Sequence, residues 1–337
     1  DGFDDLFIGA RSFPGVYGKD PDSYLFINDG KGHFNDIAKT KNADIAHIGM
    51  VTGAVWVDIT RDKQKELIIV GEWMAPRIFS FTGDDFEEIK TNISSKFGWW
   101  QTVAAADVNG DGRQDLILGN MGKNFYLRPD SANPVKLWMN DFDKNGSLDK
   151  IISYTVNNRD MPVFLKQDMQ EQLPFIKKNN LKHQEYATKS VQDLFPGEMM
   201  EGCIVKRFDY VPSCIAINNG NGQFSIQELP TMVQLSCINA IFPMDVNEDG
   251  YIDLVMGGNQ FGLLPQFERL DGSFGDILIN DGKGEFTWQP SNRTGLNLRG
   301  ELRDIKAIKS TKGTHVLFLQ NNEFPLLYKL QTTDKRK

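Results

Sequence analysis

The sequence is poor in the residue types that most often form catalytic and zinc sites. Its 337 residues include only four histidines, which are scattered, and neither an HExxH nor a GxSxG motif occurs. The three cysteines, Cys203, Cys214 and Cys237, do not have the spacing of zinc ligands. We expect buried free thiols at these positions. The alternative is a disulfide between Cys203 and Cys214 across a hairpin.

Long apolar runs and an excess of positive charge are also lacking. No run approaches the roughly 18 apolar residues of a membrane-spanning helix, so no such segment is expected. The net charge of −8 disfavours nucleic acid as a partner. The hydrophobic content of 40% supports a packed core, and the 31 glycines favour short strands joined by tight turns. No signal peptide is visible, but Asp1 lies inside a repeat motif, so we expect the natural polypeptide to begin upstream.

A loop rich in side-chain oxygen atoms recurs along the chain. Residues 107–115 read DVNGDGRQD, residues 141–149 read DFDKNGSLD, and residues 245–253 read DVNEDGYID. The chain opens inside a further copy, DGFDDLFIG, and residues 58–66 (DITRDKQKE) form a degenerate one. Oxygen side chains at alternate positions of a tight loop suit calcium, which takes six to eight oxygen ligands. The recurrence itself predicts a repeat architecture.

Loops of this type use the side chains at positions 1, 3, 5 and 9 and the backbone carbonyl at position 7, with glycine at position 6 for the sharp bend. This predicts three structural Ca²⁺ ions, and the alternative is a set of solvated turns without metal. The predicted ligands of the first loop are Asp107, Asn109, Asp111, Arg113 and Asp115. Those of the second are Asp141, Asp143, Asn145, Ser147 and Asp149, and those of the third are Asp245, Asn247, Asp249, Tyr251 and Asp253.

The degenerate loop departs from this pattern at three positions. Thr60 replaces an acidic or amide residue, Lys63 replaces glycine, and Glu66 replaces aspartate. Lys63 or Lys65 is a candidate to supply the positive charge in place of an ion, so we expect no calcium there.

Hairpins with an asparagine–glycine or aspartate–glycine turn follow the acidic loops, as in LFINDGKGHF (25–34), AINNGNGQF (216–224) and LINDGKGEF (278–286). Together these elements predict an all-β fold, a β-propeller of six or seven four-stranded blades. The blades are expected near 1–40, 48–92, 99–139, 140–229, 236–290 and 299–330. Residues 1–330 would form one domain, with a helical insertion at about 159–200 between the second and third strands of the fourth blade. A disordered tail is expected at 331–337.

The motifs DVNGDGRQDLILGN and DVNEDGYIDLVMGGN resemble FG-GAP/VCBS repeats, the blades of the integrin-alpha propeller. The order of GEWM (71–74), GNMGKN (119–124), the helical insertion and GGNQFG (257–262) is similar to a bacterial ASPIC/UnbV-like branch. The resemblance implies a calcium-bearing propeller in an extracytoplasmic location, either secreted, periplasmic or associated with the outer membrane. It implies no defined activity.

A ligand is expected on the face opposite the acidic loops, where linkers join second strands to third strands. The candidate side chains there are Arg11, Glu72, Trp73, Asn120, Asn259 and Gln260. An aromatic and amide-rich rim would suit a glycan or a peptide, whereas the alternative is that Trp73, Trp99 and Trp100 pack between blades.

The sequence therefore favours a non-catalytic, calcium-binding propeller that binds a protein or a glycan at the bacterial surface or in the periplasm, with this fragment a monomer. One alternative is a calcium-dependent polysaccharide lyase or hydrolase on the same scaffold, because paired carboxylates are abundant. Another is a purely structural module of a longer exported protein. Fold alone does not decide among them.

Overall fold

The computed structural model describes residues 2–83, 85–311 and 313–331, and it confirms an all-β protein with few helices. Six antiparallel sheets account for the strands in these ranges. The expected tail at 331–337 lies outside the described residues except for residue 331. No helix in the described ranges is long and apolar enough to cross a membrane.

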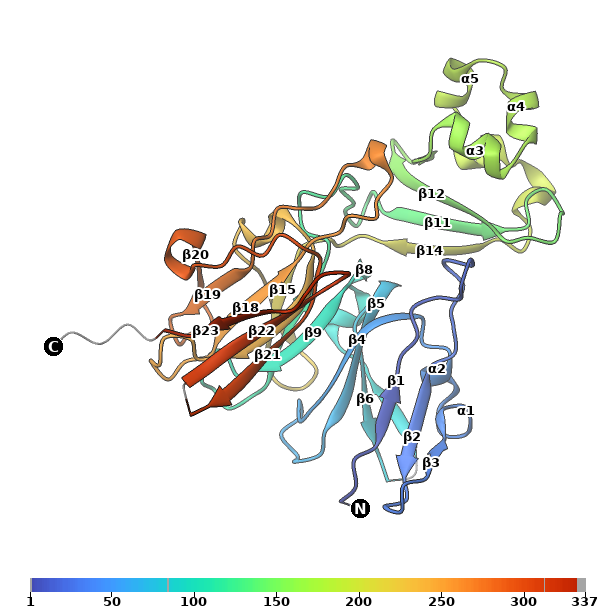
Figure 1. The fold of residues 1–337 in the computed structure, drawn as a ribbon. Coiled ribbons are helices and arrows are strands. Elements are labelled where there is room, and N and C mark those ends of the chain that lie inside the picture. Colours follow the sequence, from blue (N-terminus) through green and yellow to red (C-terminus); the bar gives the residue numbers. More distant parts are fainter. Residues whose placement is uncertain (1, 84, 312, 332–337) are drawn as a thin grey trace.

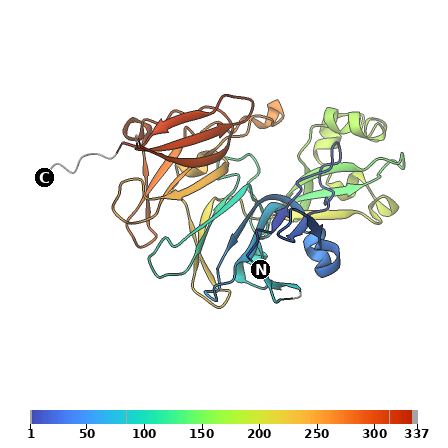
Figure 2. The same cartoon turned by 60° about the horizontal axis from the view of Figure 1, so that its bottom comes forward.

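Five of the sheets follow one another around the molecule in chain order, from blue to red in Figures 1 and 2. The first contains β1 (Leu6–Ile8), β2 (Tyr24–Asn28) and β3 (Phe34–Asp36). The second contains β4 (Met50–Val57), β5 (Glu66–Met74), β6 (Arg77–Phe81) and β7 (Phe86–Ile89), and β8 (Gly98–Trp99) also pairs with β5. The third contains β9 (Thr102–Ala106), β10 (Asp115–Gly119), β15 (Cys214–Asn218) and β16 (Phe224–Glu228).

The fifth sheet contains β17 (Ile238–Met244), β18 (Asp253–Gly258), β19 (Asp276–Asn280) and β20 (Phe286–Gln289). The sixth contains β21 (Leu302–Ser310), β22 (Gly313–Gln320) and β23 (Leu326–Lys329). The first strands of neighbouring sheets lie against one another, so that β4 contacts β9, β9 contacts β17, and β17 contacts β21. The sheets therefore radiate from a line of inner strands, and apolar side chains fill the wedges between them.

The fourth sheet lies apart from this row and carries most of the helices (Figure 1). Its strands are β11 (Val135–Asn140), β12 (Asp149–Val156), β13 (Arg159–Pro162) and β14 (Ile204–Phe208), in the order β13-β12-β11-β14. Between β13 and β14 lie α3 (Lys166–Gln172), α4 (Phe175–Asn179), α5 (His183–Ala187), α6 (Val191–Leu194) and η2 (Gly197–Met200). The other short helices are α1 (Ala38–Lys41), α2 (Ala43–Ala46), α7 (Ser291–Thr294), η1 (Asn92–Ser95), η3 (Val233–Leu235) and η4 (Pro265–Phe267).

The strand pairing corrects the predicted division into units at 99–139 and 140–229. Strand β10 pairs with β15, so the hairpin at 216–224 belongs with the acidic loop at 107–115. The whole fourth sheet is inserted between the second and third strands of the third sheet. The sequence repeat misleads here because a hairpin motif does not specify which earlier strand it pairs with. The helical segment lies within this inserted sheet, between β13 and β14.

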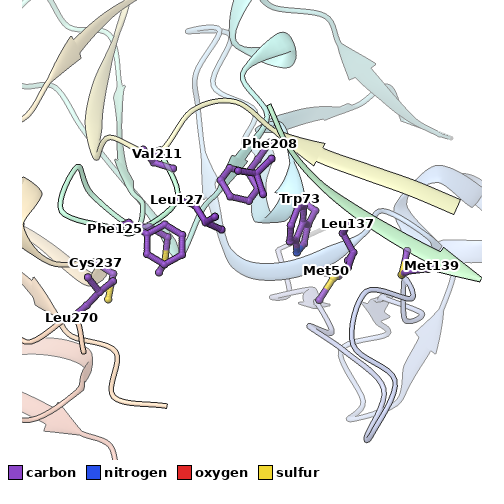
Figure 3. Packing of buried hydrophobic residues seen from close by; sticks show 12 residues of the cluster. Met50, Trp73, Phe125, Leu127, Leu137, Met139, Phe208, Val211, Cys237 and Leu270 are labelled. Carbon is purple, nitrogen blue, oxygen red and sulfur yellow. The ribbon is translucent and has the colours of Figure 1, made fainter. Parts of the chain in front are cut away.

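An apolar cluster joins the inserted sheet to the row (Figure 3). Trp73, from the second sheet, packs against Phe208 of β14 with ring centroids 4.9 Å apart and against Trp99 at 5.4 Å. Leu137 and Met139 of β11 belong to the same buried cluster. The contact fixes the inserted sheet against β5 and β8, which are its neighbours in space.

Glycines at the ends of second strands let neighbouring backbones approach. A Cβ at Gly119 would lie 2.3 Å from the carbonyl oxygen of Ile238, and one at Gly258 would lie 1.8 Å from that of Cys237. Such distances exclude any side chain. The amide of Ile238 donates in turn to the Asn120 carbonyl at 3.0 Å. The contact at Gly119 thus joins the third sheet to the fifth, whereas the contact at Gly258 lies within the fifth sheet, where Gly258 pairs with Ile238.

Asparagines of the hairpin turns link adjacent sheets at the opposite end of the strands. Asn218 of the third sheet donates through Nδ2 to the carbonyl of Ile59 in the second sheet, at 2.8 Å. Asn280 of the fifth sheet donates in the same way to Val108 in the third sheet, at 2.7 Å. Both asparagines are almost fully buried. Buried polar bonds of this kind are costly to break, because the remaining partner is left unsatisfied.

We expect Asn280→Ala to lower the free energy of unfolding by about 1–3 kcal/mol, because it leaves the Val108 carbonyl without its partner. Urea denaturation measures the change. The control is Asn35→Ala in β3, where the side chain is exposed and a change within about 0.5 kcal/mol is expected. Equal unfolding free energies for the two variants would contradict the role assigned to Asn280.

Candidate metal centres and ligand-binding grooves

The acidic loops occupy equivalent places in the fold. The loops at 58–66, 107–115 and 245–253 connect the first strand to the second in the second, third and fifth sheets. They therefore leave the same end of the inner strands. The loop at 141–149 makes the corresponding connection between β11 and β12 of the inserted sheet.

All four loops share one backbone conformation, with positive φ at positions 4 and 6. The values at these two positions are 73° and 81° for Gly110 and Gly112, 58° and 87° for Lys144 and Gly146, 58° and 94° for Glu248 and Gly250, and 67° and 73° for Arg61 and Lys63. In each loop the aspartate at position 1 accepts the amide hydrogen of position 6 at 2.8–2.9 Å. The degenerate loop thus keeps the backbone conformation of the intact loops, although neither of its two positions is glycine. Positive φ costs energy for residues other than glycine.

The acid at position 9 is buried in every loop. Asp115, Asp149, Asp253 and Glu66 have relative exposures of 0%, 4%, 0% and 0%. Each accepts the amide hydrogen of position 2 at 2.8–3.1 Å. Burial raises the pKa of each of these carboxyl groups, and the neighbouring loop acids raise it further. Like charges are therefore held close together, and a bound cation would relieve their repulsion.

The donor set fits a hard divalent cation. In the loop at 141–149, oxygen atoms of Asp141, Asp143 and Asp149 all lie within 4.8 Å of one another. In the other two intact loops an asparagine replaces the second acid, and its amide approaches the acid at position 5. These contacts are Asn109 to Asp111 at 3.4 Å and Asn247 to Asp249 at 2.8 Å. Carboxylate and amide oxygens are calcium ligands. The position 7 carbonyls of Arg113, Ser147 and Tyr251 stay predicted ligands.

The two lysines of the degenerate loop do not replace an ion. Lys63 and Lys65 are exposed, and neither forms an ion pair within the described ranges. Glu66 is instead held by the amides of Ile59 at 2.8 Å and Thr60 at 3.3 Å. Backbone hydrogen bonds therefore maintain this loop.

On the opposite face, two of the predicted rim residues lie inside the protein. Glu72 is fully buried, pairs with Arg11 and accepts the Tyr17 hydroxyl at 2.6 Å. Burial and the neighbouring Glu72 carboxylate raise the pKa of Tyr17 well above its usual value. Trp73, at φ 60° and 3% exposure, donates from Nε1 to the Tyr17 hydroxyl at 2.7 Å. These side chains join the first two sheets rather than forming an exposed rim.

The predicted amides are also enclosed. Asn120 donates through Nδ2 to the Tyr210 carbonyl at 3.0 Å, and its Oδ1 accepts the Met121 amide at 2.9 Å. Asn259 bonds through both side-chain atoms, to Ser236 at 2.8 Å and to the Ser273 carbonyl at 2.9 Å. Of the six candidates, only Arg11 and Gln260 keep accessible side chains. The tryptophans Trp73 and Trp100 pack in the interior, at 3% and 1% exposure.

A groove on this linker face contains aromatic residues that the sequence did not single out. Its volume is about 470 Å³, and Tyr126, Arg128, Tyr154 and Phe267 line it. Tyr126 stacks on Phe267 with centroids 4.4 Å apart and rings 8° from parallel. Tyr154 is 42% exposed, and Arg128 forms no ion pair in the described part of the chain. The groove forms where the inserted sheet meets the linker before β19, and no local motif marks such a junction.

Residues 58–118 match the FG-GAP-like repeat. The match spans the degenerate loop and the first intact loop, and it supports the FG-GAP resemblance, while the ASPIC/UnbV-like branch stays a prediction. No curated protein matches the sequence at a significant level. Among solved structures, the V. cholerae biofilm matrix protein Bap1 is similar at 8% identity and a TM-score of 0.29. That comparison covers 94% of this chain and 66% of the Bap1 chain, just under two thirds.

The cysteines match the expected buried free thiols in part. All three cysteines are free, with Cys214 and Cys237 buried and Cys203 partly buried. Burial raises the pKa of the Cys214 thiol to about 12, so it is not a reactive thiolate at neutral pH.

Calcium binding should weaken as the pH falls from 7 to 5. The pKa values of Asp115, Asp149 and Asp253 are raised, so protons compete with the ion at a higher pH than they would at ordinary aspartates. In excess chelator, the effect of pH on the stability of the protein has the opposite direction. A carboxyl with a raised folded pKa binds protons more tightly in the folded state, so acidification adds to its contribution to stability. Melting curves with excess calcium and with EDTA at both pH values measure this, and an equal calcium-induced shift at pH 7 and pH 5 would contradict it.

Proposed function

We propose that this chain is a calcium-stabilised, non-catalytic β-propeller module that acts outside the cytoplasm and binds a protein or a glycan. The observation that carries the proposal is the common geometry of the acidic loops. They share positive φ at two positions, a carboxylate that accepts the position 6 amide, and a buried acid at position 9. The FG-GAP-like match over residues 58–118 supports the same reading.

The radial order of the sheets supports the propeller. The inner strands β4, β9, β17 and β21 succeed one another in contact, as the innermost strands of propeller blades do. We propose that the five sheets of this row are propeller blades, with the inserted sheet outside the row.

Calcium in this proposal has a structural role. The position 9 acids of the third and fifth sheets also accept the amide hydrogens of Asn218 at 2.8 Å and Asn280 at 2.9 Å. These are the asparagines that bond to the preceding sheet. An ion on Asp115 or Asp253 would therefore stiffen a connection that runs from one sheet into the next.

The protein should bind three Ca²⁺ ions, and its melting temperature should fall in excess EDTA. Asp249→Asn, which removes one charge from the third intact loop, should reduce the number of tightly bound ions by one and lower the melting temperature in calcium. The control is Asp271→Asn, because Asp271 is 63% exposed and lies outside the loops. Elemental analysis after dialysis and calorimetric titration measure the number of ions. An unchanged melting curve in EDTA and no bound calcium would contradict the proposal.

The groove between Tyr126, Tyr154 and Phe267 supports the binding role. Aromatic rings beside Arg128, which has no ion-pair partner among the described residues, suit the face and the hydroxyl groups of a sugar or the side chains of a peptide. The groove lies on the linker face, where the sequence predicts a ligand.

We expect Tyr154→Ala to weaken binding of a glycan-array or peptide-array hit by about 10-fold, the effect of losing one aromatic contact of about 1.5 kcal/mol. Tyr24→Ala in β2 is the control, since Tyr24 is similarly exposed at 39% but lies in the first sheet. The same hits are incubated with the protein and analysed for cleavage. Unimpaired binding by Tyr154→Ala would reject the groove, and cleavage of a hit would reject the non-catalytic role.

A further inference from the structure

A second pocket lies at the loop end of the molecule, between the second and third sheets. Its volume is about 250 Å³. Two arginines, Arg61 and Arg113, line it together with Thr60, Thr91, Asn218 and Asn221, and no carboxylate is part of its lining. In a chain with a net charge of −8, this lining is unusual because it holds two guanidinium groups, of which only that of Arg113 has an acidic partner, Asp111, among the described residues. It therefore attracts anions.

Arg61 comes from the degenerate loop. It occupies position 4 with φ 67°, and its side chain reaches toward the neighbouring sheet, where Nη2 would lie 3.3 Å from a Cβ at Gly112. It is exposed and forms no ion pair within the described ranges. A guanidinium without an acidic partner keeps its hydrogen-bond donors available for a ligand.

Arg113 comes from the adjacent intact loop and lies over the hairpin turn of the third sheet. Its Nε would lie 3.5 Å from a Cβ at Gly220. Its Nη1 pairs with Asp111 at 3.2 Å, and this contact uses only one of its five donors. Asn221 of the same turn is exposed, and no side-chain hydrogen bond is assigned to it in the described structure.

The floor of the pocket is apolar. Ile59, Ile78 and Phe224 are at most 7% exposed there, and Ile89 is partly exposed beside them. They belong to the apolar wedge between the second and third sheets. The pocket thus combines a charged rim with a hydrocarbon base. Its volume is below the roughly 300–1,000 Å³ of pockets for drug-sized ligands, which limits the occupant to about one small ring.

We propose that this pocket binds a hexuronate residue of an acidic saccharide. The planar carboxylate takes hydrogen bonds from Arg61 and Arg113, an arrangement that guanidinium groups favour because their donors match two carboxylate oxygens. The C–H face of the sugar ring lies on the isoleucines of the floor. The site is distinct from the Tyr154 groove, which lies on the opposite face, and it stands whether or not that groove binds a ligand.

The experiment is calorimetric titration of the full chain with trigalacturonate in calcium-containing buffer, compared with the neutral galactotriose. Wild-type protein should bind the acidic trisaccharide and not the neutral one. Arg61→Gln should weaken binding by about 10-fold or more, as expected for loss of a hydrogen bond to a charged group. The matched control is Arg293→Gln, an exposed arginine in α7, which should bind within about twofold of wild type.

Three results would overturn the proposal. They are the absence of binding of trigalacturonate to wild-type protein, equal binding of galactotriose, and unchanged binding by Arg61→Gln. The last result is also expected if the sugar binds only through calcium in the loops, because the Arg61→Gln substitution would not affect that mode of binding. Arg61→Lys is the second variant if Arg61→Gln does not fold. It keeps the charge but loses the planar fork, so weaker binding than wild type supports the proposal and equal binding contradicts it.

Discussion

A buried carboxylate at the start of the second strand, present in four of the six described sheets, is the constraint on which the arrangement of the sheets depends. Asp115 accepts one hydrogen bond from Val108 within its own loop and another from Asn218 in the third strand of the same sheet. The Asn218 side chain then bonds to Ile59 in the sheet before. Asp253 and Asn280 repeat this connection to Val108 one sheet later. A charge that burial would otherwise disfavour is thus stabilised by a chain of hydrogen bonds that crosses from sheet to sheet.

The two ends of the strands have different tasks. At the loop end, acids and hairpin asparagines set the spacing of the sheets, and an arginine at position 4 of the loop at 58–66 places the Arg61 side chain against its neighbour. At the linker end, Gly119 and Gly258 allow backbones to touch, and the linkers vary in length. The longest linker, between β10 and β15, contains the inserted sheet with its own acidic loop and helices. New surface, including the groove beside Tyr154, arises where that sheet meets the row.

Much of the fold could be predicted from the sequence, because its signals are local. The acidic loops, the hairpin turns and the helical stretch each occupy a few consecutive residues whose chemistry dictates their conformation. The pairing of the hairpin at 216–224 with β10 could not be predicted, since an inserted sheet separates the two in the chain. The same motif that predicted a turn at Asn218 and Asn280 did not reveal that their side chains bond to the preceding sheet.

The candidate ligand residues illustrate the same limit. Glu72, Trp73 and Asn259 are polar or amphipathic residues that the sequence places in linkers, which usually lie at the surface, whereas Glu72 and Trp73 belong to the end of β5. Glu72 and Trp73 are buried because the first sheet and the inserted sheet cover them, through contacts such as Tyr17 with Glu72 and Phe208 with Trp73. Asn259 is instead enclosed by its bonds to Ser236 and Ser273. Tyr126 and Phe267, by contrast, are brought together from distant parts of the chain. Spacing in the sequence carries no information about either outcome.

The measurement that tests the central claim most directly is a crystal structure grown in calcium, with anomalous diffraction collected to locate the ions. The account predicts peaks inside the loops at 107–115, 141–149 and 245–253, each at about 2.3–2.6 Å from the oxygens of positions 1, 3, 5, 7 and 9. It also predicts that the asparagine bonds between neighbouring sheets are retained. Loops without anomalous density at saturating calcium, or sheets joined without those bonds, would contradict it.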